Sequence, residues 1–89
     1  MGVAALKIKF MPESPDTDLE KLKAEIKISL KKQGAIRIES IEEEDIAFGL
    51  TALIITIAWP EDFETEKIEN LKIKGISSVQ IIDYRRAFG

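Results

Sequence analysis

Residues 46–60 read IAFGLTALIITIAWP, which is the most apolar stretch of the chain. From Leu50 to Trp59, apolar side chains fall on both faces of an extended chain. This pattern is typical of a strand in the centre of a sheet, where both faces are covered. Pro60 follows and ends the pattern, because proline has no N–H to donate to a neighbouring strand. We therefore expect a buried central strand over residues 50–59.

A tight connection, Phe48-Gly49, leads into this strand, and the four acidic residues 42–45 come just before it. A large aromatic residue beside glycine and carboxylates is more typical of an exposed loop tip than of a core. Exposed aromatic side chains in loops commonly bind partners. On residue type alone, two interpretations of Phe48 stay about equally open: a docking residue and a partly buried turn residue.

The N-terminal part of the chain predicts a strand followed by a helix. Residues 3–11 alternate between apolar and polar with the period of two that a half-buried strand requires. Residues 18–33 have the spacing of an amphipathic helix. Thr17 and Glu20 form a capping-box pattern at its start, and Gly34 supplies the left-handed residue that ends it.

The rest of the chain predicts two more strands around the central one and a second helix. Residues 35–45 alternate until Ile41, which arrives one position out of phase and indicates a bulge near Ser40. Residues 62–74 have the apolar spacing of a shorter helix, and residues 77–86 alternate as a fourth strand.

The order strand, helix, strand therefore occurs twice in one small chain. Two such units with right-handed crossovers give the split βαβ or ferredoxin-like sandwich. We predict an α+β fold whose antiparallel four-stranded sheet has the order 4-1-3-2 and carries both helices on one face. A chain of 89 residues supports one modest core, so a single domain is expected. The fold hosts many unrelated activities, and function has to be argued from particular sites.

The composition excludes most enzyme chemistry. The chain has no cysteine and no histidine, which excludes disulfides, thiolate nucleophiles, imidazole bases and the usual zinc ligands. Its five glycines are isolated, so it has no phosphate-binding glycine loop. The acidic run 42–45 lacks the spaced ligands of a calcium loop, and a solvated edge is favoured over a Mg²⁺ site. We expect no catalytic residues, no cofactor and no metal, and hence a protein that is not an enzyme.

Charge and hydropathy argue against nucleic acid and membrane as partners. The chain has 13 basic and 16 acidic residues, a net charge of -3, which is unlike the surface of a nucleic-acid binder. We expect Lys7, Lys9, Ile82 and Tyr84 on the sheet face turned away from the helices, without the stacked aromatics of an RNA-binding platform. No apolar run approaches the ~20 residues that span a bilayer. The N-terminus matches neither a signal peptide nor a myristoylation site, so a cytoplasmic protein is expected.

Two stretches carry a family resemblance: the hairpin Ile46-Ala47-Phe48-Gly49-Leu50 with the strand after it, and the last strand, Ser78 to Asp83. Both are similar to the translation elongation factor 1-beta family, the guanine-nucleotide exchange factors of elongation factor 1-alpha. The resemblance covers essentially the whole chain at the size of the short archaeal form. It implies that residues 1–89 are a single exchange domain, without the extra N-terminal parts of eukaryotic relatives.

The resemblance implies a partner and a way of binding it. The partner is elongation factor 1-alpha, a GTPase, bound in its GDP form and nucleotide-free while GDP is replaced by GTP. The exchange factor itself binds no nucleotide. By similarity, Phe48 docks into the GTPase, with Ile46, Ala47, Gly49 and Leu50 around it.

The other end of the domain departs from the family pattern. Eukaryotic relatives have a lysine next to the last residue, where it disturbs the Mg²⁺ site of the GTPase, and this chain has Phe88 there. After Lys74 the only side-chain cations are Arg85 and Arg86. Arg85 and Arg86 are therefore candidate substitutes for that lysine.

Two functions of other classes stay open at this point. One is an RNA-binding or ribosome-associated module, which the net charge disfavours. The other is a regulatory domain that senses small molecules such as amino acids.

Overall fold

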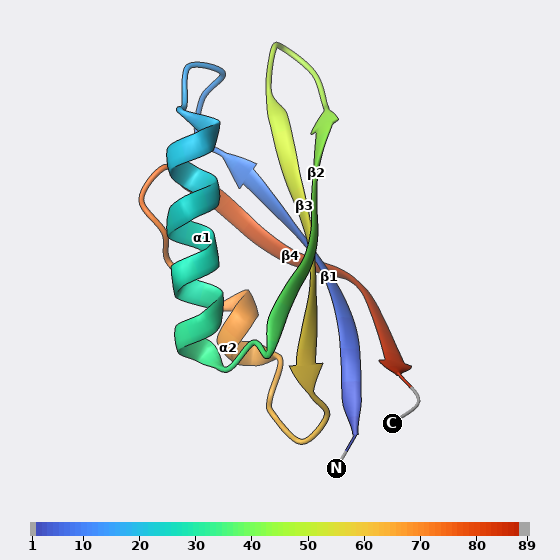
Figure 1. The fold of residues 1–89 in the computed structure, drawn as a ribbon. Coiled ribbons are helices and arrows are strands. Elements are labelled where there is room, and N and C mark those ends of the chain that lie inside the picture. Colours follow the sequence, from blue (N-terminus) through green and yellow to red (C-terminus); the bar gives the residue numbers. More distant parts are fainter. Residues whose placement is uncertain (1, 88–89) are drawn as a thin grey trace.

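An antiparallel sheet of four strands forms one layer of the molecule, and both helices lie on the same side of it (Figure 1). The computed structural model describes residues 2–87. Its strands have the order β2-β3-β1-β4, which is the predicted order 4-1-3-2 read from the other edge, so the α+β ferredoxin-like fold is confirmed. The elements are β1 (Val3–Pro12), α1 (Leu19–Gln33), β2 (Arg37–Asp45), β3 (Thr51–Pro60), α2 (Glu66–Glu69) and β4 (Ile76–Ala87).

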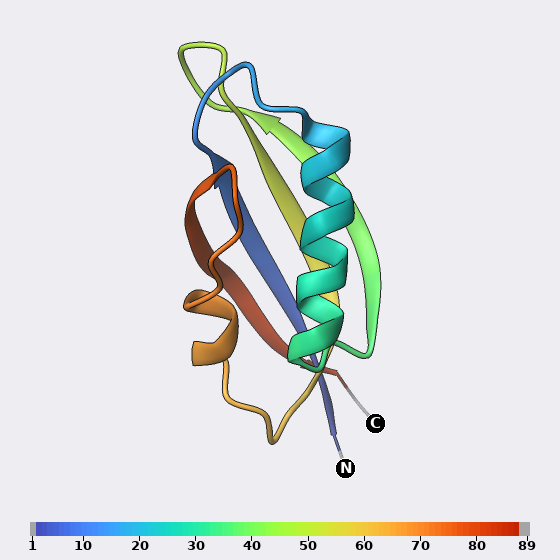
Figure 2. The same ribbon diagram turned by 90° about the vertical axis from the view of Figure 1, so that its left-hand side faces the viewer.

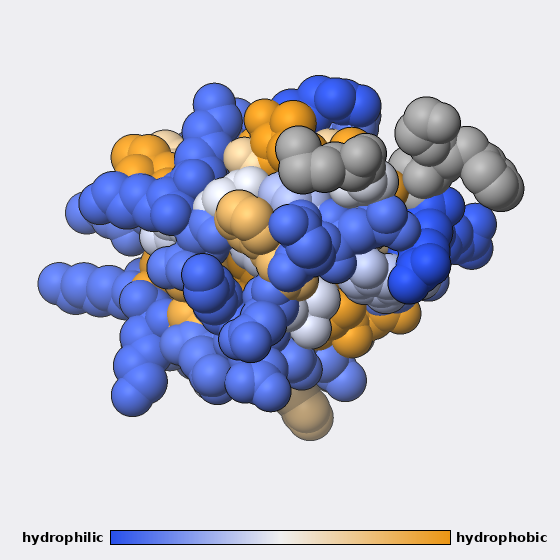
Figure 3. All heavy atoms as spheres, turned by 90° about the horizontal axis from the view of Figure 1, so that it is seen from below, coloured by the Kyte–Doolittle hydropathy of each residue, from blue (hydrophilic) through white to orange (hydrophobic). Residues whose placement is uncertain are grey.

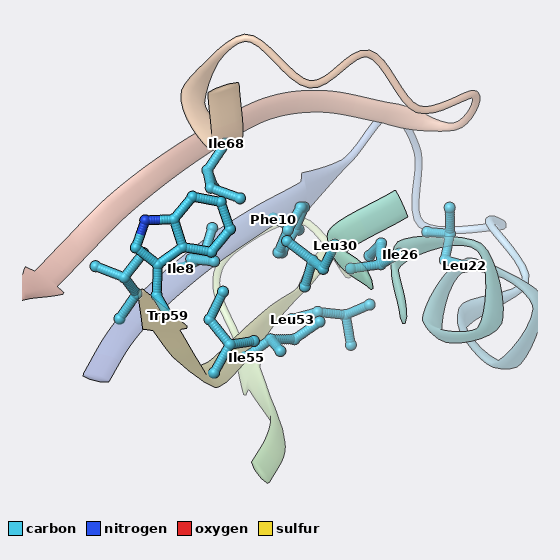
Figure 4. Close-up of a cluster of buried hydrophobic side chains, with 11 residues drawn as sticks. Ile8, Phe10, Leu22, Ile26, Leu30, Leu53, Ile55, Trp59 and Ile68 are labelled. Carbon is cyan, nitrogen blue, oxygen red and sulfur yellow. The ribbon is translucent and has the colours of Figure 1, made fainter. Parts of the chain in front are cut away.

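The two central strands supply most of the core. In β1 every second side chain is buried, and in β3 both faces are covered, as the apolar run predicts. Figure 4 shows the cluster, with Trp59 and Ile68 at one end and Leu22 of α1 at the other. Its buried members are Leu6, Ile8, Phe10, Leu22, Ile26, Leu30, Leu53, Ile55, Ile57, Trp59 and Ile68. Figure 2 shows α1 running along the sheet and α2 beside β4.

Helix α1 begins one residue later than the capping box predicts. Asp18 is the N-cap, and its Oδ1 accepts hydrogen bonds from the backbone N–H groups of Glu20 (3.1 Å) and Lys21 (3.3 Å). The prediction that Thr17 caps the helix is wrong, because its hydroxyl donates to the carbonyl of Ser14 instead (2.9 Å). A carboxylate at this position also stabilises the helix, because its negative charge lies near the positive end of the helix dipole.

The second helix is much shorter than predicted. The sequence pattern indicates residues 62–74, whereas α2 spans only Glu66–Glu69 and buries Ile68 alone. Thr65 offers no side-chain cap, so the first turn lacks the hydrogen bond that an N-cap side chain would accept. In a continued helix Ile73 would lie about 140° around the axis from Ile68. The chain leaves the helix instead, and Leu71 and Ile73 both pack against the core from an irregular segment.

Both edge strands contain an irregularity that changes which side chains share a face. In β2 the register shifts between Ile38 and Ser40, which confirms the predicted bulge. In β4 a second shift, opposite Lys7 and Ile8 of β1, was not predicted. Beyond it Tyr84 lies opposite Leu6, on the helix side of the sheet. The expectation that Tyr84 shares the open face with Lys7 is therefore wrong, because one extra residue in a strand reverses the alternation that follows.

Candidate functional site

The tip of the β2–β3 hairpin is a two-residue turn made by Phe48 and Gly49. The N–H of Leu50 donates to the carbonyl of Ala47 (2.9 Å), and the N–H of Ile46 donates to the carbonyl of Leu50 (2.9 Å). Phe48 has φ +56° and Gly49 has φ +78°. Positive φ at both central positions is the pattern of a type I′ turn, whose twist matches that of the flanking strands. This turn normally selects asparagine or aspartate before glycine, and not an aromatic residue.

Phe48 combines two features that are unfavourable for an aromatic residue in this turn. Its side chain is 95% exposed, and it is the one non-glycine residue with positive φ among residues 2–87. A non-glycine residue in this region costs about 1–3 kcal/mol. The predicted exposure of Phe48 is thus confirmed, and a partly buried turn residue is excluded. Its docking role stays a prediction.

The side chains around Phe48 make an apolar tip. Ile46 is 40% exposed, Ala47 is exposed, and Leu50 is half-buried. Pro15, from the loop between β1 and α1, lies next to the turn: a β-carbon added to Gly49 would lie 3.5 Å from the Cβ of Pro15. The structure therefore brings together the five predicted residues 46–50 and adds Pro15, for which the sequence gives no signal.

The acidic run beside the tip is not a freely solvated edge throughout. Glu43 Oε2 lies 2.8 Å from the Nζ of Lys23, and Lys23 is also 2.8 Å from Glu20 on the same helix. Glu44 Oε1 lies 3.4 Å from the Nζ of Lys9. The hydrogen bond that the Lys23 ammonium group donates to Glu20, and then the one it donates to Glu43, raise the pKa of Lys23 above its ordinary value. Within residues 2–87, no group of three or more acidic residues is arranged to hold a metal ion.

The two arginines at the other end lie on opposite faces of β4. Arg85 faces Ala5 and Arg86 faces Ala4 in the register of β1. The Nε of Arg85 lies 3.0 Å from Asp83 Oδ2, and the Nε of Arg86 lies 3.1 Å from Glu61 Oε1. Both guanidinium side chains are largely exposed, and Figure 3 shows hydrophilic side chains over most of this end of the molecule.

The structure does not bring these arginines near the hairpin tip. The molecule is 42 Å long, and Figure 1 shows the tip at one end and the last residues of β4 at the other. Arg85 shares a row of the sheet with Ala58, and the strand from Thr51 to Ala58 alone covers about 23 Å. Phe88, at the position where eukaryotic relatives have lysine, lies outside the described residues.

The open face of the sheet offers no aromatic platform within the described residues. Lys7 lies opposite Asp83 in the register of the sheet, and Lys9 is paired with Glu44, so each lysine has an acidic residue beside it. The aromatic side chains of β1 and β3, Phe10 and Trp59, are buried in the core on the helix side. Among residues 2–87 there is also no helix whose length and apolarity would let it cross a membrane.

Comparison with known proteins gives one consistent family. Residues 5–86 match the EF-1 guanine nucleotide exchange domain. A protein named elongation factor 1-beta from Methanosarcina barkeri is 48% identical over 97% of this chain and 99% of its own length. A protein of the same name from Methanobrevibacter smithii is 44% identical over 97% of this chain and 98% of its own length. Another, from Halorubrum lacusprofundi, is 42% identical over 91% of this chain and 93% of its own length.

Proposed function

Since the chain belongs to the EF-1 guanine nucleotide exchange domain family, we propose that it docks on elongation factor 1-alpha through the tip of the β2–β3 hairpin. Its function is guanine-nucleotide exchange on that GTPase: it promotes the replacement of GDP by GTP. We infer further that residues 1–89 act as a single exchange domain and work in the cytoplasm, where translation takes place.

The observation that best supports the docking proposal is the exposure and backbone conformation of Phe48. A phenyl ring that is 95% exposed, on a backbone with φ +56°, makes no contribution to the core that could offset its strain. Binding offsets both costs, because a partner pocket covers the ring and buried aromatic anchors are common binding hot spots. Ile46, Ala47 and Leu50 widen the apolar contact around that anchor.

Exchange of this kind needs binding energy and no covalent chemistry. An exchange protein binds the nucleotide-free GTPase more tightly than the nucleotide-bound form. The affinity of the GTPase for nucleotide then falls by the same ratio, since coupling between two ligands is reciprocal. Lowering nucleotide affinity from nanomolar to micromolar takes about 4 kcal/mol. One aromatic anchor and a few polar contacts supply free energy of that size. We therefore assign no catalytic residue and no nucleotide-binding site to this chain.

A second contact is proposed at the opposite end, through Arg85 or Arg86. Both are exposed cations, each in a surface ion pair, Arg85 with Asp83 and Arg86 with Glu61. Such pairs are worth about 0–1 kcal/mol, so either arginine can exchange its partner for a phosphate or carboxylate of the GTPase. A GTPase that meets both Phe48 and an arginine has to reach along most of the 42 Å length of the molecule.

The test is release of a fluorescent GDP analogue from an archaeal elongation factor 1-alpha, with and without this protein. We expect strong acceleration by the wild-type chain and a large rise in the half-saturating concentration for Phe48→Ala. Ile28→Ala is the matched control, because Ile28 is an exposed apolar side chain on α1, away from the hairpin tip. No acceleration by the wild-type chain at saturating concentration would contradict the proposed function.

A further inference from the structure

We propose that Lys23, Lys9 and Pro15 are positioning residues that brace the hairpin tip for docking, without themselves touching the GTPase. The inference rests on the proposed function of the tip, and it assigns a role in exchange to residues on three other segments of the chain. We call these contacts, Lys23 with Glu43, Lys9 with Glu44 and Pro15 with Gly49, the tip brace.

The tip needs support because it extends beyond the body of the sheet. The pairing between β1 and β3 ends at Phe10 and Leu53, so residues 44–52 form a ribbon of two strands only. Figure 1 shows this part of the hairpin reaching past the end of β1. An isolated two-stranded ribbon is marginally stable in water, and its turn here includes the strained Phe48.

The first contact is at the base of the ribbon, on the helix side of the sheet. Glu43 lies opposite Leu53, a core residue, so its side chain is on the face that α1 covers. Lys23 of α1 reaches it at 2.8 Å, and Glu20, also at 2.8 Å, holds the ammonium group in the same position. The lysine side chain is only 22% exposed, which is consistent with a fixed geometry.

The second contact holds the ribbon from the open face. Glu44 lies opposite Ala52, one position along from Glu43 and therefore on the other side of the sheet. Lys9 of β1 comes within 3.4 Å of Glu44. Glu43 and Glu44 are neighbours in β2. The first is thus tied to Lys23 on the helix side of the sheet and the second to Lys9 on the open face, which restrains bending of the ribbon toward either side.

The third contact is at the end of the ribbon. Pro15 lies next to Gly49, close enough that a β-carbon added there would touch its ring, and it belongs to a loop that is itself anchored. The N–H of Thr17 donates to the carbonyl of Ser14 (3.3 Å), and the N–H of Glu13 donates to the carbonyl of Gly75 (2.9 Å). Figures 1 and 2 both show this loop at the same end of the molecule as the tip.

A braced tip lowers the cost of docking, because the turn is already ordered before the partner arrives. Loss of the brace should therefore raise the concentration of exchange factor needed for half-maximal GDP release. The maximal rate should change little, because the docked complex is the same. The loss should also depend on Phe48, since the brace acts through the position of that ring.

The experiment combines Lys23→Gln with Phe48→Ala in a double-mutant cycle, read by release of a fluorescent GDP analogue. We expect Lys23→Gln to raise the half-saturating concentration about threefold to tenfold with the maximal rate unchanged. The same substitution should have little effect in the Phe48→Ala background. Lys23→Arg should retain wild-type behaviour. Lys27→Gln removes the same charge one turn along α1 and should have no effect.

Hydrogen exchange of the free protein tests the brace without any partner. The amide hydrogen of Leu50, which donates to the carbonyl of Ala47, should exchange faster in Lys23→Gln than in the wild type. Unchanged amide exchange, or an equal loss of affinity with and without Phe48, would overturn the inference. If instead the wild-type chain fails to release GDP, the proposed function fails, while amide exchange still decides whether the brace exists.

Discussion

The indole N–H of Trp59 donates a hydrogen bond to the backbone carbonyl of Phe63 (3.3 Å), and the two rings meet edge to face with centroids 5.6 Å apart. This contact fixes the loop after β3 at the end of the molecule that carries the arginines. Glu61, the ion-pair partner of Arg86, belongs to the same loop. Trp59, a core residue, thus helps to position the loop that carries Glu61, and Glu61 holds Arg86.

Phe63→Ala should destabilise the fold by about 2 kcal/mol, because it removes the aromatic pair and exposes Trp59. Denaturant unfolding followed by the fluorescence of Trp59, the only tryptophan of the chain, measures this change. Exchange at saturating concentration should be retained. Unchanged stability would show that the edge-to-face contact contributes nothing measurable.

Phe48→Asn should change stability and binding in opposite directions. Asparagine before glycine is the preferred sequence of a type I′ turn, so the substitution should raise the free energy of unfolding by about 0.5–1 kcal/mol. Removal of the aromatic anchor should weaken binding to elongation factor 1-alpha by roughly 2 kcal/mol. Thermal unfolding and a binding titration measure the two effects separately. A loss of stability together with unchanged affinity would mean that Phe48 serves the fold and not the partner.

The turn could be predicted from the sequence because its signals are local. Phe48-Gly49 lies between an acidic run and an apolar strand, and both the hairpin and the exposed ring are present in the structure. The alternation of residues 3–11 and the phase change at Ile41 likewise predicted two strands and one bulge correctly. Patterns of this kind depend on which side chains face a core, and the sequence records that directly.

The parts that could not be predicted depend on contacts between distant residues. Lys23 and Glu43 are 20 positions apart, and each looks like an ordinary surface charge in the sequence. The bulge that turns Tyr84 to the helix side has no local marker such as glycine. The helix predicted at residues 62–74 is too long because Ile68 and Leu71 have helical spacing. Ile73 packs against the core only because the chain has left the helix before it.

Gly34→Ala should weaken the end of α1 and the loop that packs on it. Gly34 has φ +120°, which an alanine adopts only with strain, and an added β-carbon would collide with the ring of Phe63. We expect a loss of stability of about 1–3 kcal/mol. Thermal unfolding measures it, and Gly49→Ala is a useful comparison, because its β-carbon would meet only ordinary contacts with Pro15. A smaller loss for Gly34→Ala than for Gly49→Ala would contradict the predicted collision.

The pKa of Lys23 should be higher in the folded protein than in the unfolded chain, because Glu20 and Glu43 accept hydrogen bonds from its ammonium group. A raised pKa means that this contribution to stability is complete below the unfolded value of about 10.4 and is lost as pH rises through the folded value. NMR titration of the Lys23 Cε signal measures the midpoint. The midpoint should fall in Glu20→Gln and, by a smaller amount, in Glu43→Gln; no change in either variant would exclude the ion pairs in solution.

Arg85 and Arg86 can be tested separately because they lie on opposite faces of β4, paired with Asp83 and Glu61. If one of them acts on the phosphate and Mg²⁺ region of the GTPase, its replacement by glutamine should slow GDP release at saturating concentration about tenfold or more, the effect of one charged hydrogen bond. The complex should still form, because Phe48, the proposed anchor, is at the other end of the molecule.

Replacing both arginines with glutamine should slow release at least as much as the more damaging single change, and Lys72→Gln provides a control for the loss of positive charge elsewhere. Deletion of Ala87, Phe88 and Gly89 should matter less than loss of the arginines, because no cation is removed. Release at the wild-type rate by the double variant would show that the charge of this end has no part in exchange. Destabilisation of Mg²⁺ would then have to come from pressure of the docked domain on the backbone of the GTPase.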